Sequence, residues 1–289
     1  MEELLLRVLM HAISNLVSIP TFVILCSYSS LHQNFRTILI IITISGNVIS
    51  IMSYVQCYFM YVDRTVLQDP SDAISIMLYI STFTFVFANL CLTLERLLAV
   101  QFVAHYEKYS AYNSAAAVTA FATVVPAVIS GAVVCFLQTD VLPVCILLLG
   151  CSTVSAVISL VLRYKTRSNK VVSMDYSLRK KFQWEENQRT TPLYLYISLN
   201  EIFSAILIAV VIYLYKTDYN NILFTSKFDD HLADALDVIS AYRTLFTHLA
   251  VIYYSKVQRT ARKRKQMTEL SSAHLATEKY FESINEMWK

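Results

Sequence analysis

An acid and a base stand side by side at Glu95 and Arg96, directly after a long uncharged stretch. The 22 residues from Ala73 to Leu94 carry no charge, and at about 1.5 Å per residue a helix of that length crosses a hydrocarbon core of about 30 Å. An arginine at such a helix end can hold neighbouring helices together and, once they part, offer its donors to a partner's carbonyls or carboxylates. The alternative is a pair that only sits among the lipid headgroups.

Two further charges, Glu201 and Arg243, fall inside apolar stretches. Each lies about ten residues from the same end of its predicted helix, which puts both side chains roughly 15 Å deep in the membrane. An unpaired charge at that depth costs several kcal/mol, so we expect the two to pair. The pair would either lock its two helices until a ligand disturbs them or act as a static fastener between them.

Five residues are candidates for a ligand pocket. Asp234 and Asp237 are three residues apart, on one helical face, where they would attract a cationic ligand or serve only as acids favoured at a helix start. Tyr79 and Phe83, at i and i+4, with Asn89 further along, suit an apolar pocket with a few polar points. Aromatic residues at this spacing more often belong to helix packing or to the membrane interface than to a pocket.

The composition indicates the kind of element that carries these residues. Of the 289 residues, 56% are hydrophobic and 16% charged, against about 25% charged in a soluble domain. Glycine and proline number only 3 and 5, and the apolar stretches lack the alternation of a membrane β-barrel, which leaves helices. The six cysteines form no metal-ligand spacing, and neither HExxH nor GxSxG occurs. We therefore expect no metal, no cofactor and no enzyme.

The uncharged stretches predict an all-α membrane protein, a single bundle of seven transmembrane helices. The N-terminus lacks the basic region of a signal peptide, so we expect the first helix to be retained. The bundle would occupy residues 1–255 as one domain, followed by a basic tail over 256–289. The predicted spans are about 8–30, 37–61, 72–94, 112–137, 142–162, 191–215 and 231–254.

The distribution of lysine and arginine sets the predicted orientation. One set of loops and the tail hold 19 of these residues and the opposite set holds 4. Because positive charge is retained on the cytoplasmic side, the N-terminus should lie outside and the C-terminus inside. Glu95 and Arg96 then face the cytoplasm, and the basic segment Lys256–Gln266 can bind anionic lipids of the inner leaflet.

Three short motifs, in order, resemble those of a known family. The residues TLERLLAV and HYEK, within Thr93–Lys108, are similar to the E-R-x-x-A…Y-E signature of the nematode serpentine chemoreceptors of the Sra superfamily, especially Srab and Sre. Leu31–Phe35, LHQNF, resembles the family's L-x-H-x-N loop between helices one and two. Leu178–Asn187, LRKKFQWEEN, resembles its F/Y-Q-x-x-E-N element before helix six.

The resemblance implies a chemosensory G protein-coupled receptor in the plasma membrane of a sensory neuron, at its cilium. Such a receptor would bind a small-molecule odorant or tastant in the outer half of the bundle and activate a heterotrimeric G protein at the cytoplasmic face. Departures from rhodopsin-like receptors are Leu97 in place of tyrosine after the acid-arginine pair and the lack of N-P-x-x-Y in the last span. The expected switch and coupling residues are Glu95, Arg96, Tyr106, Glu107, Phe182, Gln183, Glu186 and Asn187.

Two other classes of membrane protein compete with the receptor. A small-solute transporter built from repeats needs glycine or proline breaks in corresponding halves, and three glycines with no visible repeat argue against it. A multimeric channel should show a selectivity filter, and we recognise none. Both remain as the alternative function, and neither takes nucleic acid as a partner.

Overall fold

The structure is a computed structural model that describes residues 2–27, 32–62, 68–102, 113–136, 141–168, 178–219 and 227–287. These residues form seven α-helices and no strand. The helices are α1 (Glu2–Ser27), α2 (Gln33–Val62), α3 (Gln68–Gln101), α5 (Asn113–Phe136), α6 (Val141–Ser168), α7 (Leu178–Tyr219) and α8 (Lys227–Met287).

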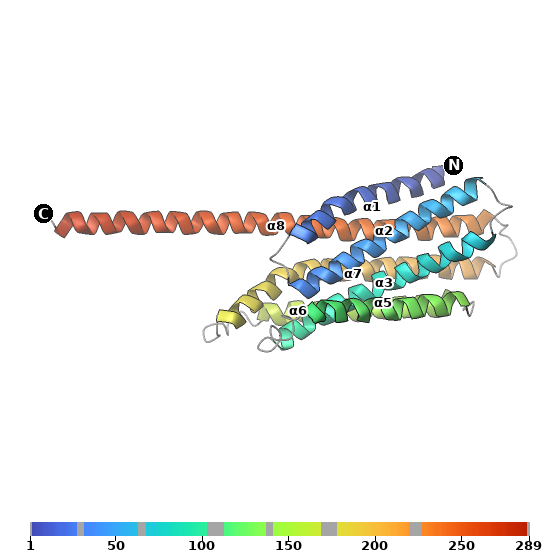
Figure 1. Cartoon of the computed structure of the whole chain (residues 1–289), viewed down its shortest axis with the longest axis horizontal. Coiled ribbons are helices and arrows are strands. Elements are labelled where there is room, and N and C mark those ends of the chain that lie inside the picture. The colour runs from blue at the N-terminus through green and yellow to red at the C-terminus, as the bar shows by residue number, and fades with distance from the viewer. Residues whose placement is uncertain are drawn as a thin grey trace. The chain divides into compact units, whose positions relative to one another are not determined.

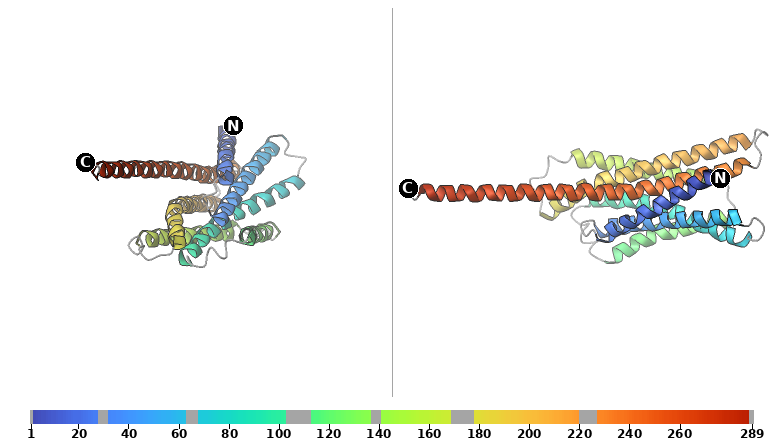
Figure 2. Two further views of the ribbon diagram at one scale, coloured as in Figure 1. Left: turned by 60° about the vertical axis from the view of Figure 1, so that its left-hand side comes forward. Right: turned by 90° about the horizontal axis from the view of Figure 1, so that it is seen from above.

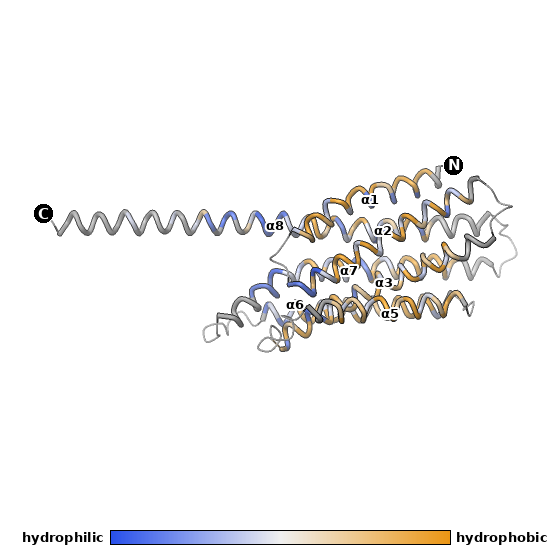
Figure 3. Tube along the Cα trace, viewed as in Figure 1, coloured by the Kyte–Doolittle hydropathy of each residue, from blue (hydrophilic) through white to orange (hydrophobic). Residues whose placement is uncertain are grey.

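Each helix contains a segment long and apolar enough to cross a membrane. Figure 3 shows hydrophobic residues along α1, α2, α3 and α5, whereas the coloured part of α7 starts with a hydrophilic stretch. The prediction of an all-α, seven-transmembrane protein is therefore confirmed. The membrane-crossing segments are Leu5–Ser27, Gln33–Phe59, Ala73–Gln101, Ala117–Cys135, Pro143–Arg167, Glu185–Leu214 and Ala235–Thr268.

Helix α3 is central to the bundle, because it packs against α2, α5, α6 and α7 (Figures 1 and 2). Its contact with α5 is close at Gly131, where an added Cβ would lie 2.6 Å from the Ile80 side chain and 3.0 Å from the Ile80 backbone nitrogen. Only glycine allows this approach of the two backbones. Helices α6 and α7 also pack against each other, and the hydroxyl of Ser159 on α6 donates to that of Ser198 on α7 at 2.9 Å.

Helices α7 and α8 extend furthest beyond the spans predicted for them. Helix α7 begins at Leu178, well before the predicted start near residue 191, and α8 continues to Met287 through the predicted tail. The segment after residue 255 contains no glycine or proline and is rich in Ala, Lys, Arg, Glu and Gln, which all favour helix. By compactness the chain divides into the units Met1–Ala250 and Val251–Lys289, of which the second is this helical continuation.

Candidate functional site

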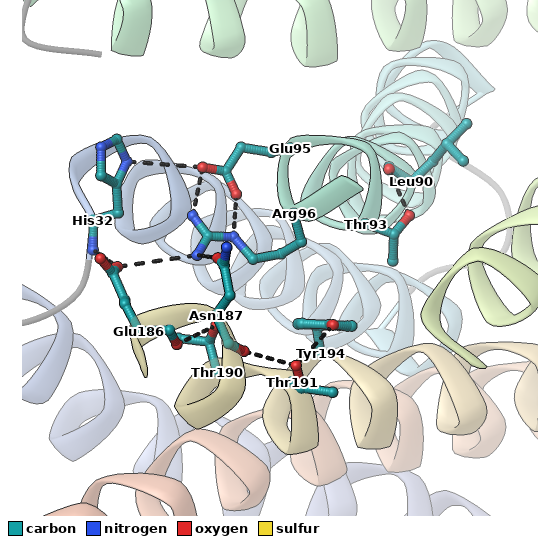
Figure 4. A network of polar contacts seen from close by, with 10 residues as sticks. All are labelled: His32, Leu90, Thr93, Glu95, Arg96, Glu186, Asn187, Thr190, Thr191 and Tyr194. Carbon is teal, nitrogen blue, oxygen red and sulfur yellow. Dashed lines mark hydrogen bonds and ion pairs between the residues drawn. The ribbon is translucent and has the colours of Figure 1, made fainter. Parts of the chain in front are cut away.

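Arg96 lies near the C-terminal end of α3 with 1% of its surface exposed. Its Nη2 donates to Glu95 Oε1 at 2.6 Å, and its Nε donates to Glu95 Oε2. Neighbours in a helix do not normally face each other, but the long arginine stem folds back so that one edge of the guanidinium matches both carboxylate oxygens. The remaining nitrogen, Nη1, points away from α3 toward α7 (Figure 4).

Helix α7 supplies the partners of Nη1. The nitrogen donates to Asn187 Oδ1 at 3.2 Å, and Glu186 Oε1 lies 4.0 Å from it. Pro192 lies within α7, and because proline lacks a backbone N–H, the turn before it has one helical hydrogen bond fewer. In the same turn, Thr191 Oγ1 donates to the Asn187 carbonyl at 2.7 Å. This local bond holds the turn that presents Asn187 and Glu186 to Arg96.

The start of α2 closes the other side of the site. His32 caps α2, because its carbonyl accepts from the Arg36 amide at 3.0 Å, while its own amide donates to Glu186 Oε1 at 2.9 Å. Its ring Nδ1 lies 3.7 Å from Glu95 Oε1. The Phe35 ring lies under the guanidinium, with its centroid 4.7 Å from Arg96 Cζ. Three segments far apart in the chain thus meet around one arginine.

A helix end contributes to the charge of the site as well as the side chains. Burial, the largest influence, lowers the pKa of His32 below its ordinary value of 6.5, and Arg96 adds to this while Glu95 opposes it. With a neutral His32, two carboxylates face one guanidinium, and the N-terminus of α2 offsets part of the excess negative charge. The donors of Arg96 are directed at groups of its own chain, so this arrangement is a closed one.

The structure describes only part of the predicted coupling residues. Glu95, Arg96, Glu186 and Asn187 come together as described. Tyr106 and Glu107 lie outside the described residues. Phe182 and Gln183 lie in the first turns of α7, and only their backbone is described.

Glu201 of α7 and Arg243 of α8 also come together, deep in the bundle and 1% and 2% exposed. Arg243 Nη1 lies 3.4 Å from Glu201 Oε1, and the guanidinium carbon lies 4.3 Å above the centre of the Phe85 ring. Asn89, predicted for the ligand pocket, belongs to this group, because its Nδ2 lies 3.5 Å from Glu201 Oε2. This contact between α7 and α8 agrees with the depth argument from the sequence.

Asp237 has a partner that the sequence did not indicate. Arg7 of α1 donates to Asp237 Oδ2 from Nε at 2.8 Å and from Nη2 at 2.5 Å, and Ser53 of α2 donates to Oδ1 at 2.7 Å. His11 Nε2 lies 3.6 Å from the same carboxylate. Asp237 therefore joins α1, α2 and α8, and a cationic ligand would have to compete with Arg7 for it. The backbone of Asp234 lies in α8, and its side chain is not described.

The two predicted pocket aromatics lie in different surroundings. Phe83 is 1% exposed and packs in an apolar cluster with Val86, Ala127 and Leu148. Tyr79, one turn earlier on α3, is 36% exposed. The position of Phe83 is that of helix packing, the second of the two interpretations that its spacing allowed.

The predictions from the sequence did not include several residues of these sites, among them His32, Phe35 and Arg7. His32 and Phe35 could have been found, because they belong to the LHQNF motif that precedes α2. Arg7 could not have been found, because nothing in its local pattern pointed to a carboxylate 230 residues away.

Comparison with known proteins gives one family. The family model described as Sre G protein-coupled chemoreceptor matches residues 72–236, more than half of the chain. The matched region includes Arg96, Glu186 and Asn187. No curated protein matches the chain.

Proposed function

The chain belongs to the Sre family of G protein-coupled chemoreceptors, and from this membership we propose that it binds a small-molecule odorant or tastant and activates a heterotrimeric G protein. It is an integral membrane protein with seven membrane-crossing helices. The resemblance seen in the sequence motifs, to serpentine chemoreceptors of the Sra superfamily, is confirmed by the family match.

The observation that carries the proposal is the enclosure of Arg96 by α2, α3 and α7. The three motifs that first suggested a receptor contribute His32, Glu95 and Glu186 to this one cluster (Figure 4). It lies at the end of the bundle that the distribution of positive charge assigns to the cytoplasm. A buried arginine held only by its own chain at that face suits a group that changes partners during signalling.

The proposed switch separates α3 from α7. When the two helices part at this end, Nη1 of Arg96 loses Asn187 and becomes a donor for a carbonyl or carboxylate of the G protein. The bidentate contact with Glu95 lies within α3 and can persist in both states. The ligand acts by binding the separated state more tightly than the closed one, because only differential affinity shifts such an equilibrium.

The ligand site is proposed for the outer half of the bundle, around Tyr79, Asp234 and Asp237. The carboxylate of Asp237 is held by Arg7, so a ligand that takes its place would release α1 from α8 at that end. This gives a ligand a physical route to move a helix. A cationic group, an amine or guanidinium, is the chemistry that would compete with Arg7.

The cellular setting follows the family. We assign the protein to the plasma membrane of a sensory neuron, at the cilium, with the N-terminus outside and the C-terminus inside. The exposed basic residues Lys256, Arg259, Lys263 and Arg264 lie on the helical continuation. They are proposed to contact anionic lipids of the inner leaflet at about 1 kcal/mol per basic residue. A solute transporter or multimeric channel is the alternative, and the family match does not favour it.

The experiment is a G protein activation assay in cells that express the tagged receptor, screened against volatile and water-soluble odorant pools beside Arg96→Ala and Arg96→Lys. We expect a ligand-dependent signal that disappears in surface-expressed Arg96→Ala. Arg96→Lys keeps the charge but lacks the planar fork, so it should signal weakly. A wild-type signal that persists in both variants would remove Arg96 from the mechanism, and solute flux without a G protein signal would move the protein to the alternative class.

A further inference from the structure

The ion pair of Glu201 and Arg243, in the middle of the bundle, has a longer contact than the clusters around Asp237 and Arg96, which lie nearer the two ends of the bundle. Arg7 and Asp237 approach to 2.5 Å, which is a closed, charge-assisted contact. Glu201 and Arg243, which are equally charged and more deeply buried, stay 3.4 Å apart. Such bonds usually measure about 2.7–2.9 Å, so the pair in the middle is held apart rather than closed.

Several atoms around this pair are buried and lack a hydrogen-bond partner within the described part of the chain. Arg243 has two such donors, Nε and Nη2, which form one edge of its guanidinium. Asn89 Oδ1 and Asn200 Oδ1 are acceptors in the same state, and so is Glu201 Oε1. All four side chains are at most 5% exposed.

Contacts connect the four residues that carry these atoms. Asn89 Nδ2 donates to Glu201 Oε2 at 3.5 Å, Glu201 lies against the Arg243 side chain, and Asn200 Nδ2 donates to the main-chain carbonyl of Arg243 at 3.4 Å. The site therefore joins α3, α7 and α8. Leaving a buried polar group without a hydrogen bond costs about 1–3 kcal/mol, and native proteins leave few such groups. No bulk water reaches this depth in a membrane, so the missing partners must be bound inside the bundle.

The chemistry of the unpartnered atoms defines the occupant. It must donate to the Asn89, Asn200 and Glu201 oxygens and also accept from Arg243. It must also be neutral, because the Glu201 carboxylate and the Arg243 guanidinium already balance. A cation would face the guanidinium and an anion would face the carboxylate, at a depth where charges interact strongly. One water molecule has only two hydrogens for the three oxygens, so at least two waters are needed to meet these requirements. Buried waters typically make about three hydrogen bonds each.

We propose that Glu201, Arg243, Asn89 and Asn200 form an internal water site that bridges α3, α7 and α8. Bound water accounts for the long distance of the ion pair and for its unpaired edge. The bridged pair can lengthen without leaving either charge bare, which permits α7 and α8 to shift past each other at this level. This holds whether or not the protein signals through a G protein, because it rests on the contacts alone.

Phe85 and Phe83 offer a matched pair for the test. Both rings lie on α3 and are buried, at 0% and 1% exposure, two residues apart. The Phe85 ring faces the Arg243 guanidinium, whereas Phe83 lies in the apolar cluster of Val86, Ala127 and Leu148. Hydroxyl radicals made by a short X-ray pulse from buried water oxidise the side chains beside that water, even where bulk solvent has no access.

The purified full-length receptor in lipid nanodiscs is exposed to microsecond X-ray pulses, and oxidation at each phenylalanine is measured by mass spectrometry. We expect Phe85 to be labelled several-fold more than Phe83. In Asn200→Leu, which removes one polar group of the site, Phe85 labelling should fall while Phe83 stays unchanged, with helix content checked by circular dichroism.

Two results would overturn the water site. One is equally low labelling of Phe85 and Phe83 in the wild-type protein. This includes the case in which Phe85 becomes labelled only after a co-purifying molecule has been extracted, because that molecule would then occupy the site in place of water. The other is labelling of Phe85 that is insensitive to Asn200→Leu in a variant of normal helix content, because the oxidising water would then lie elsewhere.

Discussion

Replacing Asn187 by alanine should shift the receptor toward its active state without ligand. The Asn187 side chain provides the hydrogen bond that ties Arg96 of α3 to α7, at 3.2 Å. A hydrogen bond to a charged group contributes about 1.5–3 kcal/mol. Because about 1.4 kcal/mol is a factor of ten, the ratio of separated to closed bundles should rise roughly ten- to a hundredfold.

The assay is ligand-independent G protein activation, divided by the amount of receptor at the cell surface. Glu186→Ala should act in the same direction as Asn187→Ala, since it removes the acceptor of the His32 amide and the carboxylate 4.0 Å from Arg96. Glu185→Ala is the matched control. That neighbouring acid is 38% exposed and pairs with Arg189 on its own helix, a contact worth about 0.3–0.5 kcal/mol.

Wild-type basal activity in Asn187→Ala at normal surface abundance would refute the closed-state argument. An equal rise in Glu185→Ala would refute it as well, because that residue does not contact Arg96. A loss of surface expression in Glu186→Ala alone would leave Asn187→Ala as the deciding variant, since it removes no charge.

Three further predictions concern packing, titration and the buried pair. Gly131→Ala should lower the stability measured by thermal unfolding by about 1–3 kcal/mol, because the added methyl group overpacks against α3. Gly150→Ala is the control, since the space at its Cβ is open, and it should not lower stability. Equal effects of the two substitutions would contradict the close approach of α5 to α3. The pKa of His32 is lower in the folded protein than the ordinary 6.5, because burial favours the neutral ring. The stability that the neutral ring contributes is therefore full above pH 6.5 and is lost as the pH falls below 6.5 toward the pKa of the folded state. An NMR titration that gives His32 a pKa above 6.5 would contradict this. Glu201→Arg and Arg243→Glu should each reduce expression and the double swap should restore part of it, and no rescue would argue against pairing.

The seven helices could be predicted from the sequence because each contains a largely apolar stretch of membrane-crossing length with few charges, and that signal is local. The same reasoning stopped at the charged end of each stretch. Helix α8 continues to Met287 because its polar residues also favour helix, a property that hydropathy does not report. Likewise, α7 begins at Leu178, among charges that mark a membrane boundary without ending the helix.

Some contacts between the site residues could be predicted from the sequence and others could not. Glu201 and Arg243 could be matched from the sequence because their depths are equal and an unpaired charge in a membrane is expensive. Arg7 and Asp237 could not, since two residues at a helix start have an aqueous alternative and no depth argument forces them together. Glu95, Glu186 and His32 were visible as motifs, but a motif indicates which residues matter and not which of them touch. Their meeting at Arg96 required the bundle.

The central claim is that this chain transmits a chemical signal to a G protein. The most direct measurement is nucleotide exchange on a purified heterotrimeric G protein by the purified receptor in nanodiscs, with and without an active odorant pool, beside solute flux and current in vesicles holding the same protein. We expect exchange that depends on both the pool and Arg96, without flux or current. Ligand-dependent flux or current with no nucleotide exchange would contradict the account.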